Sequence, residues 1–77
     1  MWIDFRTLDE LPEDSFDCYV REWKKHEDGC FEYKDYACHW LGGLRQMRIC
    51  NDWELFEIQD GMNYSYVRLP EFGFGKR

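Results

Sequence analysis

The chain has 77 residues, of which 44% are hydrophobic and 19% aromatic, and its formal net charge is −6. This length allows a single domain over residues 1–77 with one small core, and the apolar content excludes a disordered chain. No apolar run approaches the roughly 18 residues that a membrane-spanning helix needs, and the first residues lack the basic and apolar regions of a signal peptide. We therefore expect a cytoplasmic protein that makes no contact with membranes.

The N-terminal segment, residues 1–15, is acidic and contains the only expected helical turn. Residues 1–6 alternate weakly between apolar and polar side chains, which predicts a short strand. Thr7 and Glu10 have the spacing of a capping box, with Thr7 as the N-cap. Pro12 limits the helix that follows to a single turn.

Residues 16–69 are predicted to form an antiparallel meander, because short alternating segments are separated by pairs that favour tight turns. The first strand covers residues 16–23, and a charged loop follows it at residues 24–29. The later expected strands cover residues 30–33, 36–41, 44–50, 53–59 and 62–69. The turns between them fall at Lys34-Asp35, Gly42-Gly43, Asn51-Asp52 and Asp60-Gly61. Residues 70–77 form a C-terminal tail, since Pro70 ends the last strand.

The sequence therefore predicts a mostly β fold, a single-domain antiparallel sheet with one short N-terminal helical turn. An α+β fold with a helix at residues 35–47 is the alternative. Gly42 and Gly43 would lie at the centre of that helix and would cost roughly 2 kcal/mol relative to two alanines. For this reason we favour strands over this stretch.

Two-residue turns also predict the register of the meander and the face on which each side chain lies. The expected cross-strand pairs are Trp40–Arg45, Cys38–Met47, Met47–Phe56, Ile49–Glu54, Phe56–Ser65 and Ile58–Asn63. One face then collects a core stripe, which consists of Phe31, Tyr33, Tyr36, Cys38, Trp40, Met47, Ile49, Phe56, Ile58 and Val67. The opposite face is mixed and half-polar, and we expect Trp53, Tyr64 and Tyr66 to be exposed aromatic anchors.

The stretch from His26 to Tyr33, followed by Trp40-Leu41-Gly42-Gly43-Leu44, resembles the short β-meander repeat of many phage and bacterial proteins. In that repeat an acidic residue and a glycine begin one strand, and a Trp/Tyr-x-Asn-Gly-x-Leu element closes the hairpin. Here Gly42 stands where Asn is usual, and Cys30 stands where Pro is usual. The repeat family has no general enzymatic role, so the resemblance implies a fold and no mechanism.

The four cysteines, Cys18, Cys30, Cys38 and Cys50, form no C-x-x-C pair. Without a signal peptide we expect free, buried thiols. Cys38 and its neighbour His39 would point to opposite faces of a strand and would not converge on one metal ion. A zinc-dependent or thiol-dependent protein, with a Cys30–His39 pair as its reactive centre, is therefore the least favoured interpretation. We expect no metal, no cofactor and no catalytic residues.

Negative charge is concentrated near the N-terminus, where the first 17 residues contain six acidic residues and one basic residue. Such a field disfavours direct binding to nucleic acid and attracts basic surfaces. By size and charge the chain is similar to small phage-encoded inhibitors of bacterial defence, such as anti-CRISPR and anti-restriction proteins. That resemblance implies a non-catalytic inhibitor that binds a basic protein surface, the nucleic-acid-binding groove of a host complex in the host cytoplasm.

The predicted partner-binding surface combines carboxylates with aromatic anchors, because Trp and Tyr contribute strongly to binding. It consists of Asp9, Glu10, Glu13, Asp14, Asp17, Asp52, Trp53, Glu57, Asp60 and Tyr64. The alternative function is a small structural module, either a monomer or a homodimer, that associates through the mixed face of the sheet.

Overall fold

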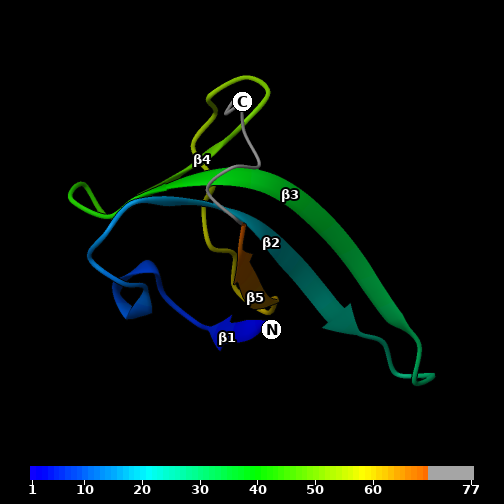
Figure 1. Ribbon diagram of the computed structural model, residues 1–77. Coiled ribbons are helices and arrows are strands. Elements are labelled where there is room, and N and C mark those ends of the chain that lie inside the picture. Colours follow the sequence, from blue (N-terminus) through cyan, green and yellow to red (C-terminus); the bar gives the residue numbers. More distant parts are fainter. Residues whose placement is uncertain (70–77) are drawn as a thin grey trace.

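The computed structural model describes residues 1–69, and the predicted tail at residues 70–77 lies outside this part. The described chain is a five-stranded antiparallel sheet with one short 3-10 helix (Figure 1). The elements are β1 (Ile3–Phe5), η1 (Leu8–Glu10), β2 (Phe16–Lys25), β3 (Phe31–Leu41), β4 (Gln46–Ile49) and β5 (Asn63–Arg68). The predicted mostly β antiparallel fold with one helical turn is confirmed, and β3, a turn and β4 occupy the place of the alternative helix. Within residues 1–69, no helix has the length and apolar character to cross a membrane.

The N-terminal segment contains the predicted strand and helical turn, but the capping box is only partly formed. Thr7 is the N-cap of η1 in an extended conformation, and its side chain makes no capping hydrogen bond. The Glu10 carboxylate accepts the backbone N–H of Arg6 at 3.3 Å. The Thr7 half of the predicted capping box is therefore wrong, and Glu10 binds one residue earlier than expected.

The β2–β3 hairpin is the longest feature of the fold, and it contradicts the predicted turn at Lys34-Asp35. Its ladder runs without interruption from the Phe16–Trp40 pair to the Lys25–Phe31 pair. The Lys34-Asp35 pair contains no glycine, and continuation of β3 keeps both residues paired with β2. Because side chains alternate along an unbroken strand, residues 31 and 33 lie on the face opposite residues 36, 38 and 40.

The turn between β3 and β4 has four residues, two more than predicted. Leu41 pairs with Gln46 and Trp40 pairs with Met47, so the predicted Trp40–Arg45 and Cys38–Met47 pairs are wrong. Arg45 closes the turn with a φ of 54°. The shift is by two residues, so it leaves every side chain on its predicted face.

The chain after β4 keeps one predicted register and loses another. Hydrogen bonds from Ile49 N–H to the Glu54 carbonyl and from Phe56 N–H to the Met47 carbonyl match the expected pairing. However, residues 53–59 form a single isolated bridge and no strand. The predicted Phe56–Ser65 and Ile58–Asn63 pairs are absent because β5 lies between β1 and β2, where it gains a hydrogen-bonded neighbour on each side.

One face of the sheet carries the core. In Figure 1 the N-terminal segment and the later part of the chain between β4 and β5 lie beneath the arch of β2 and β3. The buried apolar side chains are Phe5, Leu11, Cys18, Val20, Cys38, Trp40, Met47, Phe56, Tyr64 and Tyr66. The prediction is wrong for Phe31 and Tyr33, which are 48% and 58% exposed, and for Tyr66, which is buried. It is also wrong for Val67, which alternates with Tyr66 along β5 and lies outside the core. These errors follow from register. Without a turn at Lys34-Asp35, Phe31 and Tyr33 lie on the face opposite the core, and β5 directs its tyrosines toward the core.

Candidate functional site

The ten predicted partner-binding residues do not form one surface. Nine are exposed or half-buried, but Tyr64 is 2% exposed and belongs to the core. Its hydroxyl donates a hydrogen bond to the Glu22 carboxylate at 2.8 Å and accepts one from the Gln59 backbone N–H at 2.9 Å. Burial and the neighbouring carboxylate raise the pKa of Tyr64 to about 12. The prediction that Tyr64 is an accessible anchor is therefore wrong, since β5 is an inner strand of the sheet.

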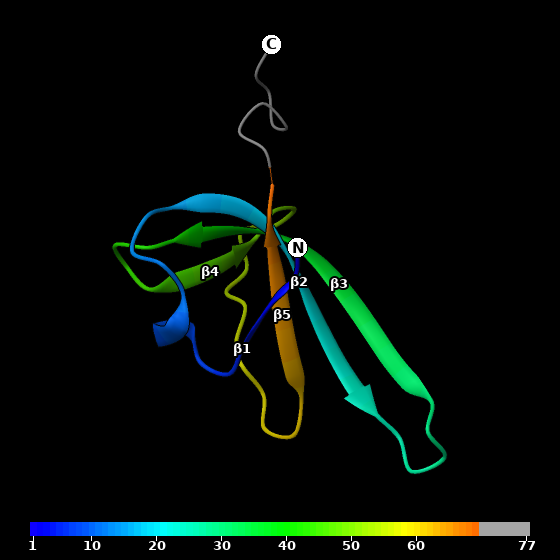
Figure 2. The same ribbon diagram turned by 60° about the horizontal axis from the view of Figure 1, so that its bottom comes forward.

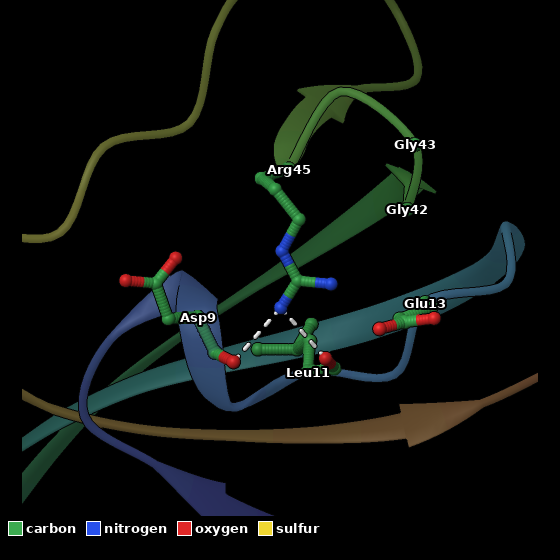
Figure 3. Close-up of a pocket in the computed structure, with 6 residues that line it drawn as sticks. All are labelled: Asp9, Leu11, Glu13, Gly42, Gly43 and Arg45. Carbon is green, nitrogen blue, oxygen red and sulfur yellow. Dashed lines mark hydrogen bonds between the residues drawn. The ribbon is translucent and has the colours of Figure 1, made fainter.

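Two of the predicted acids lie beside the β3–β4 turn. Asp9 and Glu13 line a shallow groove of about 540 Å³ together with Gly42, Gly43 and Arg45 (Figure 3). The Arg45 side chain points from the turn toward the backbone of the N-terminal segment, and the two carboxylates lie away from its guanidinium. The groove therefore presents the two carboxylates to solvent beside Arg45, whose guanidinium is already hydrogen-bonded to backbone carbonyls.

Arg45 ties the N-terminal segment to the sheet. Its guanidinium donates hydrogen bonds of 2.8 to 3.1 Å to four backbone carbonyls, those of Leu8, Asp9, Leu11 and Pro12. The Pro12 carbonyl also accepts the indole N–H of Trp40 at 2.8 Å. Since hydrogen bonds from a charged donor are the stronger kind, this arrangement serves to hold the segment over the core. Most of the hydrogen-bonding capacity of the Arg45 guanidinium is therefore used within the protein.

Gly42 completes the same junction. Its N–H donates to the Ser15 hydroxyl at 3.0 Å, and a Cβ atom at this position would overlap the backbone carbonyl of Glu13. The adjacent Gly43 has open space around it. The glycine pair that predicted a hairpin turn thus has a second role at one of its positions, which is to let two backbones approach closely.

Asp14, Asp17 and Trp53 surround a second groove, of about 500 Å³, at the other side of the sheet end. Asp14 pairs with Arg68 at 3.0 Å and Asp17 pairs with His39 at 2.5 Å, so both carboxylates have basic neighbours. The Trp53 ring lies 5.3 Å from the His39 ring and is 51% exposed. Its backbone has a φ of 61°, a conformation that bulky residues rarely adopt. The Asp14–Arg68 pair reduces the negative field that the sequence predicted here.

Glu10 and Asp60 both line a third groove, of about 690 Å³, which Asp4 and Arg6 also line. Three carboxylates there outnumber one guanidinium, although Asp4 accepts a hydrogen bond of 2.6 Å from the Ser65 hydroxyl. The other two predicted acids, Asp52 and Glu57, are exposed and line none of these three grooves. The acidic residues are therefore divided among several places, and this groove is the most acidic of them.

The thiols do not form a reactive or metal-binding centre in the described part of the chain. Cys18 and Cys38 are opposite one another on β2 and β3, fully buried, and burial raises the pKa of each thiol to about 12. Cys30 lies beyond the far end of β3, about 30 Å along the chain from His39, so the pair on which the least favoured interpretation depended does not form. Cys30 is also exposed, and the expectation that it is buried is wrong. Within residues 1–69, no group of three or more metal-ligating side chains comes together.

A surface that the sequence did not predict lies on the face of the sheet opposite the core. We call it the aromatic face, and it consists of Trp2, Arg21, Trp23, Phe31, Tyr33 and Asp35. Apart from Trp2, which precedes β1, the face lies on the part of the β2–β3 hairpin that projects from the rest of the molecule (Figure 2). We call this part, in which residues 21–25 pair with residues 31–35, the arm. The arm contributes to a long axis of 45 Å in a molecule that is 25 Å across.

The side chains of the aromatic face are ordered by contacts among themselves. The Arg21 guanidinium carbon lies 4.5 Å from the centre of the Trp2 ring and 5.0 Å from that of Tyr33. The Phe31 ring stacks on Tyr33 at 6.0 Å and lies 5.8 Å from Trp23. These groups enclose a small groove of about 240 Å³, which is open to solvent and mainly apolar.

The aromatic face has no uncompensated positive charge at its centre. Asp35 accepts two hydrogen bonds from the Arg21 guanidinium, at 2.9 and 3.1 Å. These bonds lower the pKa of Asp35, because they favour its ionised form. The pair makes the middle of the face formally neutral, and this leaves the aromatic rings as its dominant chemistry.

The distribution of glycine and proline in the sequence could have predicted this face. Residues 31–41 lack glycine and proline, and so do residues 16–25, which is typical of two long paired strands. The expected turn at Lys34-Asp35 instead placed Phe31 and Tyr33 in the core. An interpretation that required a glycine at each turn would have placed both rings on the exposed face.

Comparison with known proteins identifies no family to which this surface belongs. No protein-family model, no curated protein sequence and no solved structure matches the chain.

Proposed function

We propose that this chain is a non-catalytic protein-interaction module whose contact surface is the aromatic face of the arm. One observation carries the proposal: three aromatic rings, Trp2, Phe31 and Tyr33, are 39 to 58% exposed on a sheet face that no described element covers. Exposed aromatic groups gathered around an arginine are typical of the centre of protein interfaces. Singly scattered rings would be ordinary surface residues, but these share one groove.

The chemistry of the groove supports a protein partner that inserts an apolar side chain. The Arg21 guanidinium is already bound by Asp35 and lies over the rings of Trp2 and Tyr33. Its charge is therefore not free to neutralise a phosphate, and the chain as a whole has a net charge of −6. A volume of about 240 Å³ has room for one or two side chains and is small for a cofactor.

Two variants with matched exposure test this proposal. The double variant Phe31→Ser and Tyr33→Ser removes two rings from the groove, and Leu44→Ser removes an apolar side chain that is 68% exposed at the β3–β4 turn. Each protein is immobilised and exposed to an extract of the cells that make the chain. We expect the wild type and Leu44→Ser to retain the same protein at low and high salt, and the double variant to lose it. Equal retention by all three would contradict the proposal.

A second candidate function follows from the acidic groove that contains Asp4, Glu10 and Asp60. Its three carboxylates against one base support the predicted inhibitor, which binds a basic protein surface of a nucleic-acid-binding complex. The similarity to phage-encoded inhibitors stays a prediction. Binding of this kind is weakened by salt, because exposed charges are screened, whereas binding through the aromatic face is not.

The double charge reversal Glu10→Lys and Asp60→Lys separates the two candidates in the same experiment. Loss of the retained protein in this variant and in high salt would favour the acidic groove and exclude the aromatic face as the main contact. Retention that survives both changes would exclude the inhibitor mechanism. Glu57→Lys is the matched control, because Glu57 is exposed and lies outside that groove.

A further inference from the structure

The outer edge of β3 is unpaired along the arm. β4 pairs only with residues 38–41 of β3, and the Cys50 N–H extends this pairing by one bond to the Ala37 carbonyl. Beyond that point, no strand of the described chain lies on this side of β3, as both ribbon views show (Figures 1 and 2). Unpaired edges of this kind are templates for another strand, and proteins usually protect them.

The backbone direction at each position of this edge follows from two hydrogen bonds. The Cys30 carbonyl accepts the His26 N–H within the hairpin, so its neighbour Phe31 points its own N–H and C=O away from β2. The Ala37 carbonyl also points away from β2, toward Cys50. Because the β2–β3 ladder has no interruption, Tyr33 and Asp35 point outward as well, and no described residue binds the outward backbone groups of residues 31, 33 and 35.

The side chains select one register for pairing of this edge with a second copy of itself. A two-fold axis at Glu32, Lys34 or Asp35 would place a charged residue opposite the same residue in the second copy, which is unfavourable. An axis at Tyr33 places Glu32 opposite Lys34 twice, Tyr33 opposite Tyr33, and Phe31 opposite Asp35. This register also joins outward-pointing residues to outward-pointing residues, as an antiparallel ladder requires.

We propose that two copies of the chain form a symmetric dimer through antiparallel pairing of the β3 edges, with the axis at Tyr33. This inference goes beyond the proposed function, because it concerns a second contact, the strand edge of the arm, whose partner is another copy of the chain. About six intermolecular hydrogen bonds would join residues 31, 33 and 35 of the two copies. The pairing continues the aromatic face across the axis, because Tyr33 of each copy stands beside Tyr33 of the other.

The charged pairs of the interface are available for this contact. Glu32 is 69% exposed in its side chain and pairs with His26 at 2.9 Å on its own arm. An exposed pair of this kind contributes little, so the carboxylate can approach Lys34 of the second copy. Lys34 is itself exposed and lies 5.3 Å from the Tyr36 ring.

A charge swap tests the register. The mass of the full chain is measured by analytical ultracentrifugation over a range of concentrations for wild type, Glu32→Lys, Lys34→Glu and the double variant. We expect the wild type to dimerise and each single variant to dimerise about tenfold more weakly, because like charges then meet twice. The double variant restores opposite charges and dimerises as the wild type does. A wild type that is monomeric throughout, or a double variant as weak as the single ones, would overturn the proposal.

Amide hydrogen exchange tests the edge directly and does not depend on any variant. We expect the N–H groups of Phe31, Tyr33 and Asp35 to become protected as the concentration rises, while those of Glu32 and Lys34, which point toward β2, stay unchanged. A dimer without this pattern overturns the edge inference but leaves the aromatic face as a contact surface. A dimer with the pattern, together with equal protein retention by Phe31→Ser and Tyr33→Ser, would leave the inference standing and reject the proposed function.

Discussion

The two halves of the β2–β3 hairpin belong to one continuous ladder but differ in what covers them. Near the β3–β4 turn, the side chains of Cys18, Cys38 and Trp40 have no exposed surface. The N-terminal segment and the chain after β4 pack over them. On the arm, Phe31 and Tyr33 are about half exposed, at 48% and 58%. Both halves are rich in aromatic groups, so hydrophobic content does not explain the difference.

The difference in exposure has two causes: which segments cover the sheet, and the alternation of side chains between its two faces. The covering segments lie on one face of the sheet only, and the Arg45 hydrogen bonds hold the first of them in place. Phe31 and Tyr33 are on the opposite face, and they lie beyond the reach of β4. A small sheet can thus bury one set of aromatic side chains in its core and leave another set exposed.

The largest expected effect is at the junction that covers the packed half. Gly42→Ala places a methyl group against the backbone carbonyls of Glu13 and Asp14, which cannot move aside as a side chain would. We expect the free energy of unfolding, measured by urea titration, to fall by about 3 kcal/mol. Gly43→Ala is the control and should leave it nearly unchanged, because nothing lies near that position. Equal effects of the two substitutions would show that the close contact does not hold the segment.

Trp40 and Trp53 provide the next contrast. Trp40→Phe loses buried volume and the hydrogen bond to the Pro12 carbonyl, so the free energy of unfolding should fall by about 2 kcal/mol. Trp53→Phe changes a ring that is 51% exposed, and the expected change is within about 0.5 kcal/mol. Urea titration of both variants measures the difference, and a larger loss for Trp53→Phe would reverse the assignment of core and surface.

Besides these substitutions, the buried thiols are expected to make the stability depend on pH above about pH 9. Cys18 and Cys38 have a pKa of about 12 in the folded protein against an ordinary value of 9.0. Between these values the folded state binds more protons than the unfolded state, so the free energy of unfolding falls as the pH rises. The slope is up to about 1.4 kcal/mol per pH unit for each thiol.

Urea titrations from pH 8 to about pH 11 measure this slope. Cys38→Ala removes one of the two groups and should make the decline shallower, although it lowers stability at every pH. A slope that is the same in wild type and Cys38→Ala would assign the alkaline loss to other groups, such as Tyr64, whose pKa is also raised to about 12.

The smallest effect on stability is expected on the arm. Phe31→Ser should change the free energy of unfolding by about 0.5 kcal/mol or less, since the ring is half exposed and contacts only Trp23 and Tyr33 among the rings. The measurement is made at a low protein concentration, so that association does not contribute. A loss as large as that expected for Trp40→Phe would place Phe31 in the core and remove the basis of the comparison.

Local patterns predicted much of the fold. Alternation predicted the strands around residues 16–23 and 62–69, and glycine pairs predicted the turn at Gly42-Gly43. The Met47–Phe56 register is also confirmed, because a short turn limits how its two ends can pair. The turn at Lys34-Asp35 failed because its evidence was only a polar pair, and the long ladder with β2 overrides such a weak local preference.

The candidate surface was predicted less well than the fold. Trp53 was correctly expected to be exposed, but Tyr64 and Tyr66 were assigned to the wrong face because β5 was expected to pair with residues 53–59. The rings of Phe31 and Tyr33 were assigned to the core. The tyrosine error concerns which strands are neighbours, and side-chain alternation alone does not contain that information. The error at Phe31 and Tyr33 comes from the false turn at Lys34-Asp35, which broke the alternation of one continuous strand.

The sequence by itself determined what is local: a small antiparallel β protein, where most of its strands lie, its one helical turn and its acidic start. These properties depend on residues a few positions apart, whose backbone preferences and alternation act over short distances. Only the tertiary structure decided that β5 lies between β1 and β2, that Arg45 holds the N-terminal segment, and that the arm leaves an aromatic face and a strand edge uncovered. These features depend on contacts between residues far apart in the chain, whose burial and hydrogen bonds outweigh local preference.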